Sequence, residues 1–197
     1  PVRRNVVVAD EIYEYLSYGE VPHFSFARIE GMYDRTATVN GMSKGYAMTG
    51  WRLGFMGAPE WLAEACDKVQ SQFTSGASSI AQRAAMAALL AGPEPVQYMV
   101  EAFKSRRERF LTALRSAHKL HVDTPPGAFY AYVDVRAYLD DRYPTSNDLV
   151  MYLLEHGVAG VPGEAFGTPG YIRFSYAASQ SDLDRAAERI ANALNAL

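Results

Sequence analysis

The sequence predicts an α/β fold in which the C-terminal part of a large α/β domain, residues 1–100, is followed by a smaller α+β domain, residues 101–197. An apolar run from Val6 to Val8 ends at Asp10, which is typical of a strand buried on both faces of a parallel sheet. Strands and helices then alternate. After about residue 117 the pattern changes to short strands with two interleaved helices, which places the domain boundary within the preceding long helix.

Two further strands and two helices are expected in the first part. Residues 36–40 and 52–57 have the short apolar pattern of strands. A helix over residues 59–73 opens on a proline, which is favoured in a first helical turn. A second helix is predicted over residues 79–90, and Gly92-Pro93 is its stop signal.

A long helix over residues 94–117 leads into the second part. Its apolar residues recur at helical spacing and form much of one face: Val96, Val100, Phe103, Phe110, Leu111 and Leu114. Four strands are expected beyond it, at residues 121–123, 129–135, 158–161 and 172–175. Two helices are predicted between and after these strands, at residues 146–156 and 181–197.

The charge pattern gives no reason to expect nucleic acid or a membrane surface as a partner. The net charge is −3, and the basic residues are scattered. The densest basic cluster, Arg106, Arg107 and Arg109, lies on the predicted long helix beside acidic residues. It indicates a solvated helix face.

Cysteine usage and hydropathy place the chain in the cytoplasm. The one cysteine, Cys66, excludes an intramolecular disulfide and fits a reducing compartment. It lies in a helical pattern, where we expect a small packed residue. No apolar run approaches the length of a membrane span, and the first residues do not resemble a signal peptide.

The loop after the second predicted strand carries the most informative chemistry. Lys44 lies there in the segment NGMSKGYAMTGWR, residues 40–52. Loop lysines are usually solvated, but Ser43 adds a hydroxyl and Arg52 a planar fork suited to a phosphate. Glycines that allow close backbone approach to a ligand recur in the same loop, at Gly41, Gly45 and Gly50.

Four segments resemble successive landmarks of the class I/II aminotransferases of fold type I, which use pyridoxal 5'-phosphate (PLP). In order they are Asp10-Glu11-Ile12-Tyr13, Ser43-Lys44 through Gly50-Trp51-Arg52, Gly127-Ala128-Phe129-Tyr130, and Arg173-Phe174-Ser175-Tyr176-Ala177. Each segment alone is weak, but four in this order cover essentially the whole chain. The segment 72–82 further resembles bacterial aspartate aminotransferases of the subgroup that includes aspartate/prephenate enzymes. The resemblance implies the C-terminal part of the large PLP-binding domain, followed by the small domain.

The resemblance also implies a catalytic set of Lys44, Asp10 and Tyr13. Lys44 would bind PLP covalently and then move the proton between the substrate Cα and the cofactor C4′. Asp10 would pair with the pyridine nitrogen and favour the protonated ring. Tyr13 would donate to the cofactor 3′-oxygen. An aspartate after a strand is otherwise a turn residue, and a tyrosine otherwise packs in the core.

Three further roles follow from the same resemblance. Ser43 and Arg52 would hold the cofactor phosphate, and Arg173 would bind the substrate α-carboxylate through its fork. Because Arg173 lies in a predicted strand, where an unpaired charge is costly, a partner for it is expected. Phe129 and Phe166 line the substrate pocket or belong to the core. The sequence contains no zinc-type Cys/His array, so no metal site is expected.

The implied reaction transfers an amino group from L-aspartate to 2-oxoglutarate, giving oxaloacetate and L-glutamate, with prephenate as a further candidate acceptor. Two alternatives stay open: another fold type I PLP enzyme, such as a C–S lyase or decarboxylase, and a non-catalytic PLP-sensing regulator domain. The family also implies a homodimer acting on small molecules. The family's N-terminal half has no counterpart here. The chain also opens on a strand of a type that lies inside a parallel sheet, so neighbouring strands should precede it. We therefore expect a fragment that is inactive when isolated from the full-length enzyme.

Overall fold

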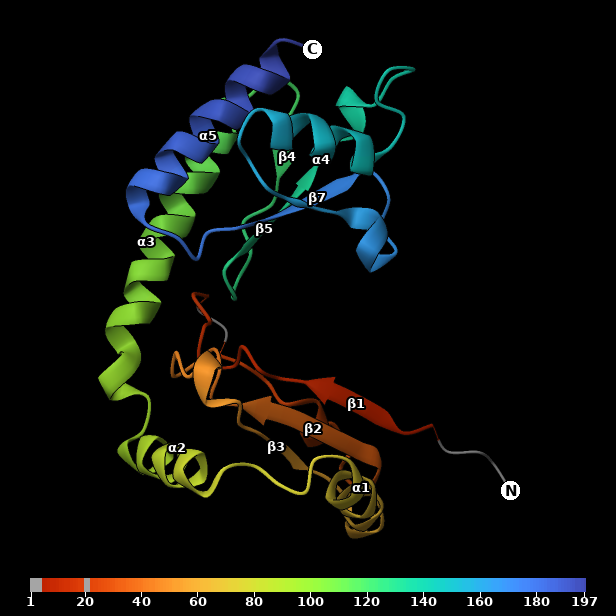
Figure 1. Ribbon diagram of the computed structural model, residues 1–197, viewed down its shortest axis with the longest axis vertical. Coiled ribbons are helices and arrows are strands. Elements are labelled where there is room, and N and C mark those ends of the chain that lie inside the picture. Colours follow the sequence, from red (N-terminus) through yellow and green to blue (C-terminus); the bar gives the residue numbers. More distant parts are fainter. Residues whose placement is uncertain (1–4, 20–21) are drawn as a thin grey trace. The chain divides into compact units, whose positions relative to one another are not determined.

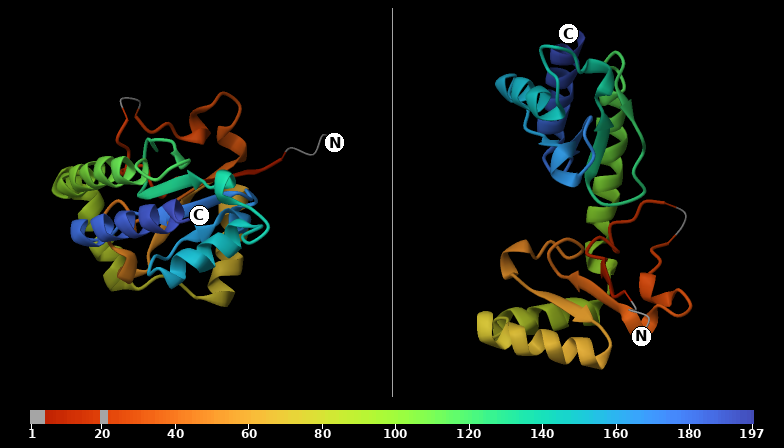
Figure 2. Two further views of the ribbon diagram at one scale, coloured as in Figure 1. Left: turned by 90° about the horizontal axis from the view of Figure 1, so that it is seen from above. Right: turned by 90° about the vertical axis from the view of Figure 1, so that its right-hand side faces the viewer.

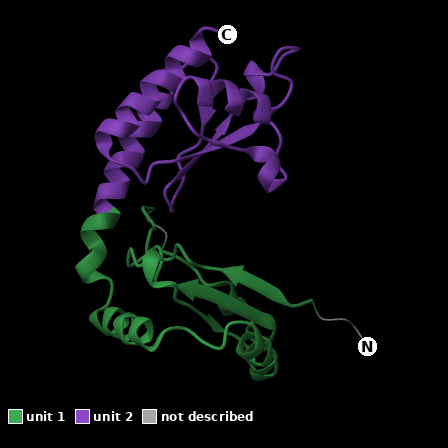
Figure 3. Cartoon of the chain, viewed as in Figure 1, with its two compact units in different colours: residues 1–100 green, residues 101–197 purple. Residues whose placement is uncertain are grey.

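The computed structural model describes residues 5–19 and 22–197 (Figure 1). The chain divides into two compact units, residues 1–100 and residues 101–197 (Figure 3). The division falls inside helix α3 (Gln97–Leu114). Among the described residues, no helix combines the length and the apolar character needed to span a membrane.

The first unit is built on a three-stranded sheet of order β1-β2-β3. Strand β1 (Val7–Asp10) pairs in parallel with β2 (Thr36–Gly41), and β3 (Gly54–Gly57) pairs antiparallel with β2. Asp10 lies opposite Val39, and Gly41 lies opposite Gly54. The end of β1, the end of β2 and the start of β3 therefore share one edge of the sheet.

Among residues 5–19 and 22–100, two α-helices and four single 3₁₀ turns complete this unit. The helices are α1 (Glu60–Phe73) and α2 (Ser79–Ala91). The turns are η1 (Phe26–Arg28), η2 (Tyr33–Arg35), η3 (Thr49–Trp51) and η4 (Glu94–Val96). Helix α2 stops at Gly92, which adopts φ +75°, as the stop signal predicted.

Two predictions of burial in this unit are wrong. The strand expected to be buried on both faces has Val8 71% exposed, and Cys66 is exposed on α1 rather than packed. Within the described part of the chain, β1 is an edge strand and α1 has no buried residue. An apolar pattern shows which face would be buried, but burial requires another element to cover that face.

The second unit has a four-stranded antiparallel sheet of order β4-β5-β7-β6. Its strands are β4 (His121–Val122), β5 (Tyr130–Asp134), β6 (Val161–Pro162) and β7 (Tyr171–Ser175). Its α-helices beyond α3 are α4 (Ser146–Glu155) and α5 (Gln180–Asn195). Single turns lie at η5 (Arg136–Tyr138) and η6 (Gly163–Phe166).

The two faces of this sheet differ in character. Ala131, Val133, Ile172 and Phe174 alternate along β5 and β7 and are buried in the core with residues of α3, α4 and α5. Helices α3 and α5 lie side by side (Figures 1 and 2), and Arg109 and Asp184 form an ion pair of 2.9 Å between them. The opposite face is only half buried. It presents the alternate residues Tyr130, Tyr132, Asp134, Tyr171, Arg173 and Ser175.

The predicted elements are confirmed, with their ends shifted by a few residues and with three further departures. The long α-helix begins at Gln97 because the Pro95 ring places residues 94–96 in a 3₁₀ turn. Strand β6 comprises only Val161 and Pro162, and Val158 is instead tied to the end of α4, since its N–H donates to the Leu153 carbonyl at 3.0 Å. Arg107 is not on a solvated face: it is 7% exposed, and its Nη1 donates to the Pro125 carbonyl at 2.7 Å.

Candidate active site

Asp10 is the last residue of β1, and Tyr13 lies in the tight turn that follows this strand. The Glu11 N–H donates to the Val39 carbonyl at 2.8 Å, which continues the pairing with β2 by one residue. The Leu16 N–H donates to the Tyr13 carbonyl at 2.9 Å, and the Leu16 side chain is fully buried. Leu16 and the strand pairing therefore fix both ends of the segment that carries Asp10 and Tyr13.

Only one oxygen of the Asp10 carboxylate accepts a hydrogen bond from this turn. Its Oδ1 accepts a hydrogen bond from the Ile12 N–H at 3.3 Å. Among the described residues, Oδ2 accepts none, and the side chain is exposed. The commoner role of an aspartate after a strand, in a turn, is thus compatible with a second interaction at the other oxygen.

Lys44 lies in a loop that is anchored on both sides. Met42 is fully buried just before it, and Tyr46 is buried just after it, in a cluster with Ala85 of α2. The Met42 N–H donates to the Leu53 carbonyl at 3.2 Å, and the Met48 N–H donates back to the Met42 carbonyl at 3.1 Å. The half-buried Lys44 is thus presented by a preorganised backbone.

Ser43 takes part in the same anchoring, since the Thr49 hydroxyl donates to its carbonyl at 2.9 Å. Thr49 opens the turn η3, which leads directly to Arg52. Both ends of the loop, and with them Ser43 and Arg52, are therefore held together across about eight residues.

At two of the loop glycines, neighbouring atoms of the protein leave no room for a side chain. A Cβ at Gly45 would lie 2.7 Å from Cδ2 of Tyr15, and a Cβ at Gly41 would lie 3.0 Å from the Gly54 Cα. A Cβ at Gly50 would meet nothing within 4 Å.

Burial raises the pKa of the Tyr15 phenol above its ordinary value, with Glu14 and Tyr46 adding to the effect. The ring against Gly45 therefore stays uncharged.

Arg52 has an unusual backbone for its residue type. Its φ of 54° and ψ of 49° lie in the left-handed region, which favours glycine. The side chain is exposed, and its Nη1 donates to the Thr49 carbonyl at 3.1 Å. No carboxylate among the described residues forms an ion pair with it.

Arg173 lies in the centre of the second unit's sheet, on β7. Its Cα is opposite Tyr132 of β5 and Val161 of β6. Its place in a strand predicted a partner, and the partners found in the described part of the chain are aromatic rings, with no carboxylate in ion-pair distance. The guanidinium carbon instead lies 4.3 Å from the centre of the Tyr130 ring and 4.4 Å from that of Phe166.

One residue of this region was missed by sequence reasoning. Glu11 is 7% exposed, and its Oε1 accepts from the Ser25 hydroxyl at 2.9 Å and from the Phe26 N–H at 3.0 Å. Its Oε2 lies 2.9 Å from Nε2 of His23. Glu11 thus ties residues 23–26 to the turn that carries Asp10 and Tyr13. No local signal marks it, because its partners lie 12 to 15 residues away.

Glu11 predicts a pH-dependent contribution to stability. Burial raises its pKa, but the hydrogen bonds from His23, Phe26 and Ser25 outweigh burial and hold the pKa below the ordinary 4.5. A carboxylate with a lowered folded-state pKa stabilises the fold above its unfolded pKa, and this contribution is lost as pH falls through the folded pKa. We expect Glu11→Gln to lower the free energy of unfolding by about 2 kcal/mol at pH 7.

Urea unfolding of the complete protein from pH 3 to pH 7 checks this prediction. The difference between wild type and Glu11→Gln should shrink as the solution is acidified below about pH 4.5. Glu64→Gln, which removes an exposed carboxylate from α1, is the control and should shift stability by less than about 0.5 kcal/mol. A difference that stays constant across the pH range would contradict the role of the charge.

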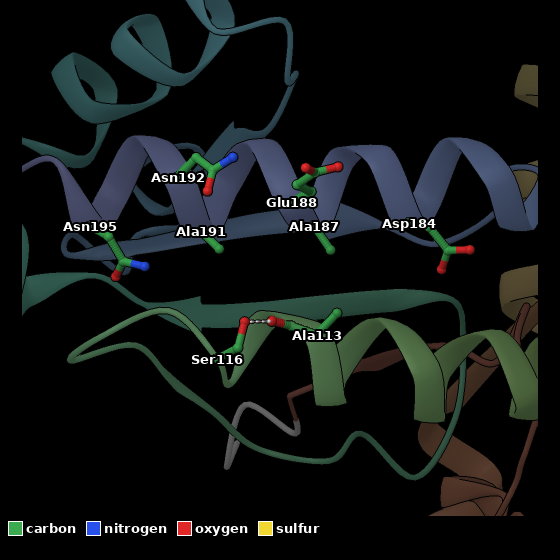
Figure 4. A pocket seen from close by; sticks show the side chains of 8 residues that line it. All are labelled: Ala113, Ser116, Asp184, Ala187, Glu188, Ala191, Asn192 and Asn195. Atoms are coloured by element: carbon green, nitrogen blue, oxygen red, sulfur yellow. Dashed lines mark hydrogen bonds between the residues drawn. The ribbon is translucent and has the colours of Figure 1, made fainter.

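A groove between α3 and α5 contains none of the predicted site residues (Figure 4). Its lining is largely small or already engaged: the Ser116 hydroxyl donates to the Ala113 carbonyl at 2.6 Å, and Asp184 pairs with Arg109. Asn195 accepts from the His118 N–H at 2.8 Å. The Arg109–Asp184 pair joins the two helices, and the groove plays no part in the predicted site.

Five of the six predicted site residues lie at one edge of the first unit's sheet. Asp10 ends β1 and Tyr13 follows it, Ser43 and Lys44 follow β2, and Arg52 precedes β3. The parallel pairing of β1 with β2 places the first four residues at the same end, and the antiparallel pairing of β3 adds the fifth. Arg173 lies in the second unit.

The model of the family "Aminotransferase class I and II" matches residues 2–190. A relative from Petunia hybrida, named bifunctional aspartate aminotransferase and glutamate/aspartate-prephenate aminotransferase, is 48% identical over 97% of this chain and 42% of its own length. The aspartate aminotransferase structure from Rhizobium meliloti is 40% identical, with a TM-score of 0.91, over 96% of this chain and 50% of its own. An aromatic aminotransferase from Pyrococcus horikoshii is 38% identical, with a TM-score of 0.88, over 97% and 51%.

These likenesses cover nearly all of this chain, and the chain spans about half the length of the relatives that it matches. The structural neighbours confirm the predicted α/β fold class of the PLP-dependent transferases. The match to the family model extends through both units and includes every predicted site residue. The chain belongs to the class I and II aminotransferase family.

Proposed function

We propose that the complete protein is a PLP-dependent aminotransferase that moves an amino group from an amino acid to a 2-oxo acid. The observation that carries the proposal is the set of groups at one sheet edge of the first unit: an amine, a carboxylate, a phenol, a hydroxyl and a guanidinium. This donor set fits the carbonyl, ring nitrogen, 3′-oxygen and phosphate of PLP. When bound, PLP supplies the electron sink that stabilises negative charge at the substrate Cα.

Lys44 would hold the cofactor covalently. Its amine would be the nucleophile toward the carbonyl carbon of PLP, and the anchored loop holds that amine in place. With substrate bound, the freed amine would act as the base that takes the proton from the substrate Cα and as the acid that delivers it to C4′ of the cofactor. One residue therefore serves both steps.

Asp10 and Tyr13 bind the ring portion. The Asp10 Oδ2, which accepts no hydrogen bond from the described residues, is available for the pyridine nitrogen and favours its protonated form. The phenolic O–H of Tyr13 donates a hydrogen bond to the 3′-oxygen. The fixed turn after β1 holds both groups in register with the lysine loop.

Ser43 and Arg52 bind the phosphate. The Ser43 hydroxyl donates one hydrogen bond, and the Arg52 guanidinium offers planar charge-assisted donors. The backbone of Arg52 supports this role, because a left-handed conformation is costly for an arginine and persists where the surroundings require it.

Arg173 binds the α-carboxylate of the amino acid and of the oxo acid. Within the described residues it forms no ion pair and no hydrogen bond with a side chain, so its donors suit an external anion. Arg136, on the same face of the sheet, differs in this respect. Its Nη2 lies 2.6 Å from Asp134, and its hydrogen bonds hold the pKa of the Asp134 carboxyl below its usual value.

L-Aspartate and 2-oxoglutarate are the proposed substrates, with prephenate as a further acceptor. The relative from Petunia hybrida carries both the aspartate and the glutamate/aspartate-prephenate activities in its name. We further propose a homodimer, in which residues 1–100 belong to the large PLP-binding domain and residues 101–197 form the small domain.

A coupled assay of the complete PLP-loaded protein tests this proposal. Mixing L-aspartate with 2-oxoglutarate should give oxaloacetate, detected by NADH oxidation with malate dehydrogenase, at a typical kcat of about 1–10³ s⁻¹. L-Phenylalanine in place of aspartate distinguishes an aromatic aminotransferase, such as the Pyrococcus horikoshii relative. Release of CO₂ or of a thiol from the amino acid without consumption of the oxo acid would instead favour a decarboxylase or a C–S lyase. PLP binding without any turnover would favour a sensor domain.

A further inference from the structure

The guanidinium of Arg173 is held by aromatic rings. Tyr130 is the first residue of β5, and Phe166 is the last residue of the turn η6. The Arg173 guanidinium carbon lies 4.3 Å and 4.4 Å from their ring centres. These distances are well within the range of cation–π contacts. We call Tyr130 and Phe166 the aromatic clamp.

The loop that carries Phe166 is tightly built. A Cβ at Gly163 would lie 2.0 Å from the Thr168 carbonyl oxygen, so only glycine fits at the start of η6. The Thr168 N–H donates to the Gly163 carbonyl at 2.9 Å, and the Gly167 N–H donates to the Glu164 carbonyl at 3.1 Å. Phe166 is 45% exposed although its backbone is held by these hydrogen bonds.

A second contact ties this loop to the body of the second unit. The Glu164 carboxylate accepts from the Ser146 N–H at 3.1 Å, at the start of α4, and the buried Ser146 hydroxyl accepts from the Gly170 N–H at 2.7 Å. Both ends of the segment 163–170 are therefore attached to one helix. The position of Phe166 over Arg173 is thus part of the folded unit and does not depend on a ligand.

A cation–π contact suits an arginine that must bind an anion. Ring faces attract the guanidinium through their quadrupole, yet they offer no strong acceptor to its N–H donors. The fork is held in place while its donors stay available. Arg136 shows the contrast on the same face: its guanidinium also lies over a ring, Tyr171 at 5.5 Å, but the Asp134 carboxylate occupies its donors.

We infer that the aromatic clamp positions Arg173 for the substrate α-carboxylate, and that Phe166 thereby sets the affinity for the amino acid and the oxo acid. This inference rests on the proposed function of Arg173. Tyr130 and Phe166 act through the arginine and are positioning residues. We expect changes at these two residues to alter KM more than kcat, because neither lies in the unit that carries Lys44.

Phe166→Leu in the complete PLP-loaded enzyme tests the inference. Leucine keeps an apolar side chain but removes the ring face. We expect KM for both substrates to rise about threefold to tenfold, as for loss of one partly exposed cation–π contact, while kcat changes less than about twofold. The cofactor absorption spectrum, which reports on the lysine–cofactor bond, should stay as in the wild type.

Two variants separate this role from simple packing. Phe166→Tyr keeps a ring face and should keep KM at the wild-type value. Tyr171→Leu is the matched control on the same face, because it removes a ring that contacts Arg136 instead of Arg173. Its KM should stay at the wild-type value. Equal KM for wild type and Phe166→Leu would overturn the clamp, as would an equal rise in Phe166→Tyr. A wild type without transamination would instead remove the proposed function itself.

Discussion

Replacing Lys44 with alanine is expected to lower kcat for transamination at least about 10³-fold, because the variant loses both the cofactor attachment and the base at the substrate Cα. The anchored loop should survive the change. Met42 and Tyr46, which hold it, are untouched, and the lysine side chain is only half buried. Steady-state kinetics of the complete protein with L-aspartate and 2-oxoglutarate measure the loss.

Two observations would confirm that the loss is chemical. Borohydride reduction of the wild type with PLP, followed by digestion, should give a modified peptide that contains Lys44, and the variant should give none. Added methylamine should restore part of the rate by replacing the missing base. Lys68→Ala, at an exposed position on α1, is the control and should keep full activity. Modification of a peptide without Lys44 would sink the assignment.

Arg173→Gln is expected to lower kcat/KM for both substrates by about 10²–10⁴-fold, since it removes two charge-assisted hydrogen bonds of about 1.5–3 kcal/mol each. Arg173→Lys should fall between this variant and the wild type, because lysine keeps the charge but not the planar fork. The absorption of bound PLP should be unchanged in both, which separates substrate binding from cofactor binding.

Arg136→Gln provides the internal control for this experiment. Arg136 lies on the same face of the same sheet and also contacts a tyrosine ring, but its donors are bound to Asp134. Its loss should change kcat/KM by less than about threefold, in line with a surface ion pair. If Arg136→Gln and Arg173→Gln lowered kcat/KM equally, the substrate carboxylate would not be bound by Arg173 in particular.

The sequence pattern predicted much of the fold because its elements have strong local signals. The valine run of β1, the glycine and proline after α2 and the alternation in β5 and β7 each specify an element from its own residues. The order of the site residues along the chain also placed them at strand ends. What remained hidden depends on neighbours that are distant in sequence.

Burial and pairing were the properties that local patterns could not supply. Arg107 belongs to a basic cluster, yet the Pro125 carbonyl 18 residues away draws it into the interior. Cys66 has helical spacing, but nothing in the described chain covers its face of α1. The aromatic partners of Arg173 lie on two separate segments, at Tyr130 and Phe166, so no spacing rule relates them.

The left-handed backbone of Arg52 has a consequence for how this gene would change over generations. An L-residue with a side chain loses about 1–2 kcal/mol in this conformation, and glycine does not. Folding alone would thus favour glycine at position 52, and the phosphate contact proposed for Arg52 would oppose that selection. In a duplicated copy released from the need for that contact, position 52 would drift to glycine early. The residue at position 52 of a related protein would then indicate whether that protein still binds PLP.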